Sequence, residues 1–150
     1  MSWTHCLRSV LSAMLLAAAP LTAEFLSFEI EFEDSGCIPC TESLESRLKR
    51  IRGAEKVAVD FERGLIQLEL EQGNRVRLGP LQARITQDGT KIRSISFVAI
   101  GSVTDGKFTP SGLTQALPLR DQMKDAGSLR LKGRLGDGVV VEASEVAVQL

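Results

Sequence analysis

The spacing of apolar residues changes on either side of one short motif, Cys37-Ile38-Pro39-Cys40, and this change most constrains the fold. Before the motif, large apolar residues alternate with glutamates over residues 28–33, which predicts a half-buried strand. After it, leucine and isoleucine recur at spacings of four and three over residues 44–51, which predicts an amphipathic helix. The two cysteines are therefore expected in the loop between a strand and a helix.

The segment after this helix has the pattern of a hairpin, a second helix and a long strand. Apolar residues alternate over residues 57–61, Arg63-Gly64 provides a turn, and residues 65–70 form the returning strand. A short helix is expected to begin at Gly79-Pro80, and the apolar, β-branched residues 92–103 predict a strand. The order strand, helix, strand, strand, helix, strand predicts an α+β class, specifically a ferredoxin-like βαββαβ antiparallel sandwich.

Three parts of the chain are expected. Residues 1–23 have the polar start, short apolar run and small residues of an export signal peptide, and the run of about ten residues is too short to span a bilayer. An uncleaved anchor is the alternative. Residues 24–100 are expected to form the ferredoxin-like domain, and residues 101–150 a β-rich C-terminal extension. Export implies an oxidising compartment, so the protein is expected to be periplasmic or secreted.

Composition excludes several function classes once residues 1–23 are removed. The remaining chain has no histidine, so it lacks Ser-His-Asp and Cys-His nucleophiles and histidine-based zinc sites. It carries 17 basic residues, because only Arg8 of the 18 lies in the signal, against 19 acidic residues. This balance predicts no nucleic-acid partner and, after signal cleavage, no membrane association. No catalytic constellation is present, and we expect a protein that is not an enzyme.

Cys37 and Cys40 are the candidate metal ligands. A thiolate is favoured at the N-terminus of a helix, where unpaired N–H groups carry partial positive charge. Two thiolates satisfy ions that accept near-linear sulfur coordination, such as Cu(I) or Hg(II), whereas a closed zinc site requires four protein ligands. Asp34 and Glu42 are the nearest carboxylates in the sequence, and such residues beside a helix start more often cap the helix or face solvent.

The chain resembles the heavy-metal-associated (HMA) domains of copper chaperones, metal-pumping ATPases and periplasmic mercury-binding proteins. The similarity covers residues 25–100, and its most specific part is the C-x-x-C at a helix start followed by Leu44, Leu48, Ile51, Gly53-Ala54, Val57-Ala58-Val59-Asp60 and Gly64. The resemblance implies capture and transfer of a soft ion, with a metal-donor or metal-acceptor protein, such as a membrane transporter, as partner. The chain departs from the family at Ser35, where the family has methionine, and at Pro39 inside the motif.

Two other functions for the motif remain open. The x-Pro-Cys sequence is also found in thiol-disulfide redox proteins, but the hairpin at Arg63-Gly64 predicts antiparallel neighbours instead of the parallel βαβ pairing of a thioredoxin fold. A partner-binding module with a merely structural Cys37–Cys40 disulfide is the third interpretation. Capture or transfer of a thiophilic ion is the function that the sequence favours.

The extension, residues 101–150, predicts three to five short strands in a barrel-like or meander arrangement. Gly101 and Gly133 lie in similar alternating runs, where a small barrel would bend. Residues 110–127 are expected to form a loop with a short helical turn, and Met123 is expected to fill the core and not to bind metal.

Overall fold

The computed structural model of the chain describes residues 25–33 and 36–146, with the side chains of residues 38, 40–42 and 146 left out. The expected signal peptide, residues 1–23, therefore lies outside the described residues. Within the described part, no helix is long and apolar enough to span a membrane.

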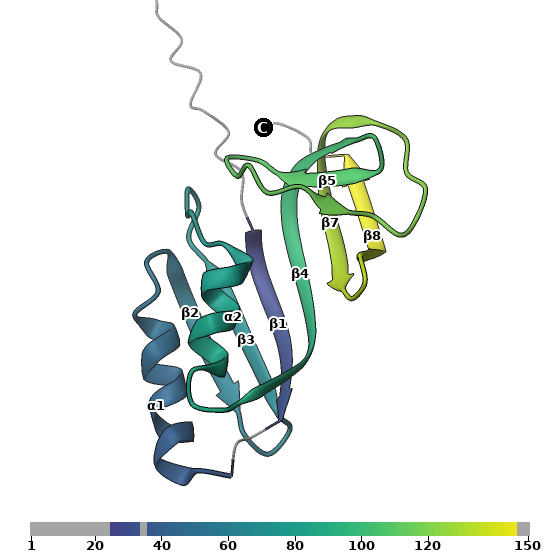
Figure 1. Cartoon of the computed structure of the whole chain (residues 1–150). Coiled ribbons are helices and arrows are strands. Elements are labelled where there is room, and N and C mark those ends of the chain that lie inside the picture. The colour runs from purple at the N-terminus through teal and green to yellow at the C-terminus, as the bar shows by residue number, and fades with distance from the viewer. Residues whose placement is uncertain (1–24, 34–35, 147–150) are drawn as a thin grey trace, which may run out of the picture.

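The described chain has α+β architecture, with two helices and mostly antiparallel strands in one eight-stranded sheet (Figure 1). The elements, in chain order, are β1 (Phe25–Glu33), α1 (Ile38–Lys49), β2 (Ala54–Asp60), β3 (Leu65–Leu70), α2 (Leu78–Thr86), β4 (Lys91–Thr104), β5 (Lys107–Pro110), β6 (Leu117–Pro118), β7 (Ala126–Leu135) and β8 (Val139–Val146). The six elements predicted over residues 25–104 are all present.

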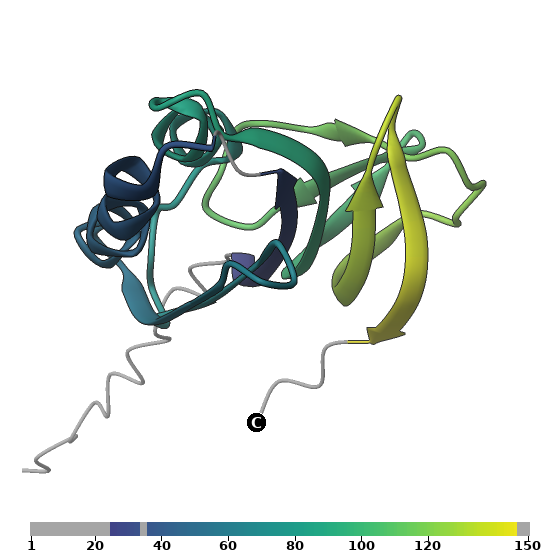
Figure 2. The ribbon, with the colours of Figure 1, turned by 90° about the horizontal axis from the view of Figure 1, so that it is seen from below.

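The first four strands lie in the order β2-β3-β1-β4, and each neighbouring pair is antiparallel. Both helices cover one face of this part of the sheet (Figure 2). The apolar positions of the alternating strands point to that face, as at Phe28, Ile30 and Phe32, each at most 2% exposed. Leu44 of α1 and Ile85 of α2 are fully buried and belong to the same core cluster. Burial of these alternating side chains stabilises the sheet and the helices together.

Strand β4 connects the two halves of the molecule. It pairs with β1 along residues 91–99 and, on its other side, with β7 along residues 95–103. The expected boundary between residues 100 and 101 therefore falls inside a continuous strand. The core is continuous as well, because Phe97 of β4 contacts both Phe25 of β1 and Phe108 of β5, at ring-centroid distances of 5.3 and 6.3 Å.

The C-terminal part contains four strands, β5 to β8, within the range expected from the sequence. β5 and β6 extend from one side of β4, and β7 and β8 from the other. A parallel bridge between Leu119 and Val139 joins these two wings, supported by a 3.0 Å hydrogen bond from the Arg120 N–H to the Val139 carbonyl. The fold therefore turns back on itself beyond residue 100.

The short helical turn expected within residues 110–127 was a wrong prediction. These residues form turns, the short strand β6 and the start of β7, with no helix. Leu117 pairs with Phe108 and is buried, so its long-range contacts, not a local helical repeat, determine the backbone. Met123 is partly buried against the core, as expected of a core-filling side chain.

Two glycines lie where neighbouring segments approach too closely for any side chain. A Cβ atom at Gly101 would lie 2.2 Å from the Thr109 carbonyl oxygen, and one at Gly133 would lie 2.6 Å from a methyl carbon of Val139. The β4–β7 register shifts just after Gly101, and the β7–β8 register shifts just before Gly133. Bulges of this kind bend strands, so both glycines lie at bends of the sheet.

Candidate metal site

Cys37 lies where β1 is connected to α1, at the end of the sheet where the β2–β3 turn and the α2–β4 connection also lie (Figure 1). It is the N-cap residue of α1, with extended backbone angles, and Pro39 is the second helical residue. Gly36 precedes it with φ of 76°, a conformation that glycine adopts without strain. The sequence Gly-Cys-x-Pro thus explains both the sharp entry into the helix and its starting point.

Cys40 is the third residue of α1, so the backbone of both cysteines belongs to the first turn of the helix. No acidic residue lies in that turn, and the N-cap residue makes no side-chain capping hydrogen bond. The N–H groups of the first turn and the helix dipole provide positive potential beside Cys37, and that turn contains no carboxylate to neutralise it. This environment favours a thiolate over a thiol once the sulfur is reduced.

Cys37 is disulfide-bonded in the structure. The chain has two other cysteines, Cys6 and Cys40, and neither side chain is among those described. A sulfur in a disulfide is not a thiolate, so metal binding at Cys37 requires reduction first.

The other candidate ligands add little to the site. Among the side chains that the structure describes within residues 25–33 and 36–146, no group of three His, Cys, Asp or Glu comes together. Asp34 and the side chain of Glu42 lie outside the description. Lys91, the first residue of β4, is exposed and lies opposite Glu33 in the register between β1 and β4. The described residues therefore supply no hard-ligand cage to complete a four-coordinate site.

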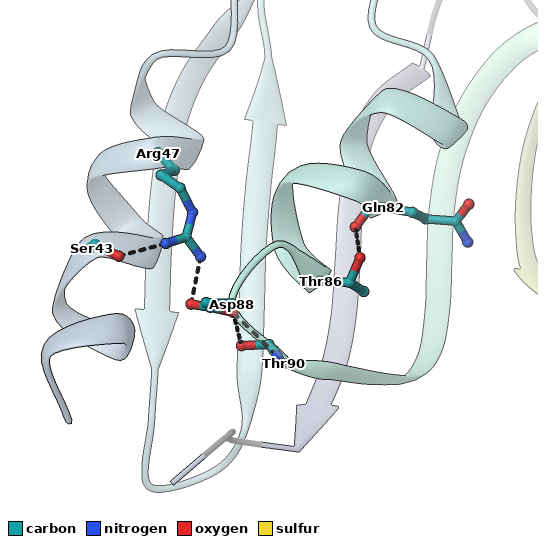
Figure 3. Close-up of polar contacts among 6 residues, drawn as sticks. All are labelled: Ser43, Arg47, Gln82, Thr86, Asp88 and Thr90. Carbon is teal, nitrogen blue, oxygen red and sulfur yellow. Dashed lines mark hydrogen bonds and ion pairs between the residues drawn. The ribbon is translucent and has the colours of Figure 1, made fainter. Parts of the chain in front are cut away.

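A polar network anchors α1 to the α2–β4 connection, as Figure 3 shows. The Arg47 guanidinium donates to the Ser43 hydroxyl and, at 2.7 Å, to Oδ2 of Asp88. The other oxygen of Asp88 accepts from the hydroxyl of Thr90 at 2.7 Å and from its backbone N–H at 3.2 Å. In α2 itself, the Thr86 hydroxyl donates to the Gln82 carbonyl and closes the last turn.

The network is largely shielded from solvent, since the Arg47 and Asp88 side chains are 16% and 9% exposed. Burial raises the pKa of Asp88, but the hydrogen bonds from Arg47 and Thr90 outweigh it and hold the pKa below its ordinary value. Nε of Arg47 is buried without a partner among the described residues. These residues fix the axis of the helix that carries both cysteines.

Sequence reasoning did not find this network. The sequence patterns assigned no role to Arg47 or to Asp88. The two residues are 41 positions apart, and no local pattern links them. The one available signal was Asp88-Gly89-Thr90, in which an aspartate precedes a threonine by two residues, the spacing of an Asx turn.

Comparison with models of known protein families found no match, and none was found among curated proteins or solved structures.

Proposed function

We propose that this protein captures or transfers a soft, thiophilic ion such as Cu(I) or Hg(II) through the thiolates of Cys37 and Cys40. The observation that supports the proposal most directly is the place of the pair, with Cys37 as N-cap and Cys40 in the first turn of α1. Two sulfur ligands, with no cluster of hard ligands among the described side chains, suit an ion of low coordination number. The role proposed is non-enzymatic.

The proposal includes a ferredoxin-like fold for residues 24–100, followed by a barrel-like extension. It is supported by the antiparallel order β2-β3-β1-β4 with both helices on one face, and by the bridge between Leu119 and Val139 in the extension. In such a domain the β1–α1 connection lies at the rim of the sheet, where a partner can approach. The partner we propose is a metal-donor or metal-acceptor protein, such as a membrane transporter, in the periplasm or outside the cell.

The oxidised state of Cys37 adds a step to this function. A protein dithiol gives two electrons and two protons to the disulfide, which becomes two thiols while the donor dithiol becomes a disulfide. Both thiols then release their protons as the ion binds. Transfer follows when two thiolates of the partner replace these two on the ion. Metal capture in an oxidising compartment would therefore depend on a reductant of the thiol class.

The disulfide also supports a second candidate function, in which Cys37 takes part in thiol-disulfide exchange or in a purely structural bond. A helix N-terminus stabilises a nearby thiolate, and a thiolate is the reactive form in exchange as well as in metal binding. The reduction potential of the disulfide separates thiol-disulfide exchange from a purely structural bond, because a structural disulfide has a potential below about −300 mV.

The deciding experiment uses native mass spectrometry on the reduced protein mixed with one equivalent of Cu(I) or Hg(II). We expect one ion per chain, retained by Met123→Leu as a matched soft-ligand control and lost in Cys37→Ser and in Cys40→Ser. Ion binding that persists in both serine variants would end the metal proposal. Absence of binding together with rapid exchange with a small dithiol would favour the redox alternative.

A further inference from the structure

A hollow of about 500 Å³ lies at the end of the sheet opposite to the β1–α1 connection. Its lining residues belong to the β3–α2 connection and the β5–β6 connection, so both halves of the chain line it. A second hollow of about 180 Å³ adjoins it over α2, and Arg75 and Arg77 line both. We call the two together the arginine hollow, because four arginines line it, namely Arg52, Arg75, Arg77 and Arg84.

The backbone beneath two of these arginines is held rigidly by Asn74. Its buried amide donates to the carbonyls of Phe25 at 2.9 Å and Glu71 at 2.8 Å, and its oxygen accepts from the Val76 N–H at 3.1 Å. Residues 74–78 alternate between buried and exposed, so Arg75 and Arg77 both project outward. Their positions are therefore fixed by core packing before any ligand binds.

Arg52 is brought to the same place by a close approach of two connections. Gly53 has φ of 96°, and a Cβ atom there would lie 2.7 Å from the Cβ of Asn74. The Glu71 N–H also donates to the Gly53 carbonyl at 2.8 Å. The α1–β2 turn and the β3–α2 connection are thus packed directly against each other, and Arg52 lines the hollow from the first of them.

The charge of the arginine hollow is uncompensated within the described part of the chain. Its lining residues include no aspartate or glutamate. None of its four arginines forms an ion pair with a described carboxylate, whereas Arg47, Arg93 and Arg134 all do. No lysine lines it either. Positive charges gathered on adjoining surfaces repel one another, and an anionic ligand bound beside these four arginines would relieve that repulsion.

We propose that the arginine hollow binds a small organic ligand with two or more clustered carboxylate or phosphate groups. Guanidinium groups bind both kinds of anion with paired hydrogen bonds, which a lysine cannot do. The two adjoining hollows, which share Arg75 and Arg77, accommodate separate anionic groups of one molecule. The combined size suits a small ligand, because such sites typically occupy about 300–1,000 Å³. The C-terminal extension then contributes one wall of a binding site.

The test is isothermal titration calorimetry of the metal-free protein with pyrophosphate and with citrate at low ionic strength, with acetate as the singly charged control. We expect saturable binding of pyrophosphate, citrate or both, weakening as salt is added, and none of acetate. Tighter binding of pyrophosphate would identify a phosphate ligand, and tighter binding of citrate a polycarboxylate. Absence of saturable binding by either would overturn the proposal.

The variant Arg75→Gln/Arg77→Gln removes the two shared arginines and is expected to weaken binding by about tenfold or more for each residue lost. Arg63→Gln/Arg93→Gln removes the same charge from exposed positions outside the hollow and should bind as the parent does. Circular dichroism confirms that both variants fold, and Arg77→Lys tests the paired geometry at constant charge. Equal losses of affinity in the two double variants would contradict the site. A glutamate-rich peptide is titrated as well, and binding of this peptide without binding of pyrophosphate or citrate would also contradict it.

Discussion

The Arg47–Asp88 pair provides a sharp test of how α1 is held in place. We consider a double-mutant cycle made of Arg47→Met, Asp88→Asn and the double variant. Methionine keeps the apolar stem of arginine, and asparagine keeps the oxygen that accepts from Thr90. Each single substitution leaves one buried partner without the other.

The expected magnitude follows from the burial of the pair. Removing one member of a fully buried ion pair costs about 3–5 kcal/mol, and exposed pairs contribute about 0–1 kcal/mol. With 16% and 9% of these side chains exposed, each single substitution should cost about 2–3 kcal/mol. The double variant should cost about the same as one single variant and not the sum of the two, because the double variant leaves no charge unpaired. The coupling energy should therefore be about 2 kcal/mol or more.

Urea unfolding of the oxidised protein measures all four corners of the cycle. Lys56→Met is the matched control, because its ion pair with Glu69 is 72% and 56% exposed, and no resolvable loss of stability is expected. Additive single effects, or an Asp88→Asn variant as stable as the parent, would refute the claim that this network fixes α1.

Three further predictions concern acid stability, packing and the β3–α2 connection. Because the folded-state pKa of Asp88 is lowered, its ionised carboxylate contributes to stability above pH 3.8, and that contribution is lost as pH falls below this value. Asp88→Asn should make the unfolding free energy, measured by urea titration, fall less steeply with pH in acid. An equally steep fall in the variant and the parent would contradict this prediction. Gly101→Ala puts a Cβ atom 2.2 Å from the Thr109 carbonyl oxygen and should destabilise the fold by about 3 kcal/mol. Gly79→Ala, where a Cβ atom would have no neighbour within 4 Å, should be neutral or stabilising. Equal thermal unfolding temperatures of the two variants would count against the bend at Gly101. Asn74→Ala removes three hydrogen bonds from a buried position and should cost about 2–3 kcal/mol by the same assay, and a cost below about 0.5 kcal/mol would show that the connection does not depend on it.

Local patterns in the sequence were sufficient to predict the six elements between residues 25 and 104. The alternation of large apolar residues with glutamate over residues 28–33 and the Arg63-Gly64 turn are short-range signals, and both matched the structure. The position of Cys37 just before a helix also followed from such signals, whereas Cys40, which was expected in the loop, is the third residue of α1.

What sequence reasoning missed depends on contacts between distant residues. Leu117 and Leu119 lie in the segment that was predicted as a loop with a short helical turn, but pairing with Phe108 and Val139 places them in extended structure. The Asn74 amide bonds the Phe25 carbonyl, 49 positions away. The oxidised state of Cys37 does not follow from the C-x-x-C spacing either, since that spacing serves metal binding and disulfide formation alike.

The measurement that tests the central claim most directly is X-ray absorption spectroscopy of the reduced protein loaded with one equivalent of Cu(I). We predict a first coordination shell made of two sulfur atoms, one from each of Cys37 and Cys40, and no signal from bound copper in the double serine variant. A shell that contains nitrogen or oxygen ligands, or one that persists when both cysteines are replaced, would contradict the account.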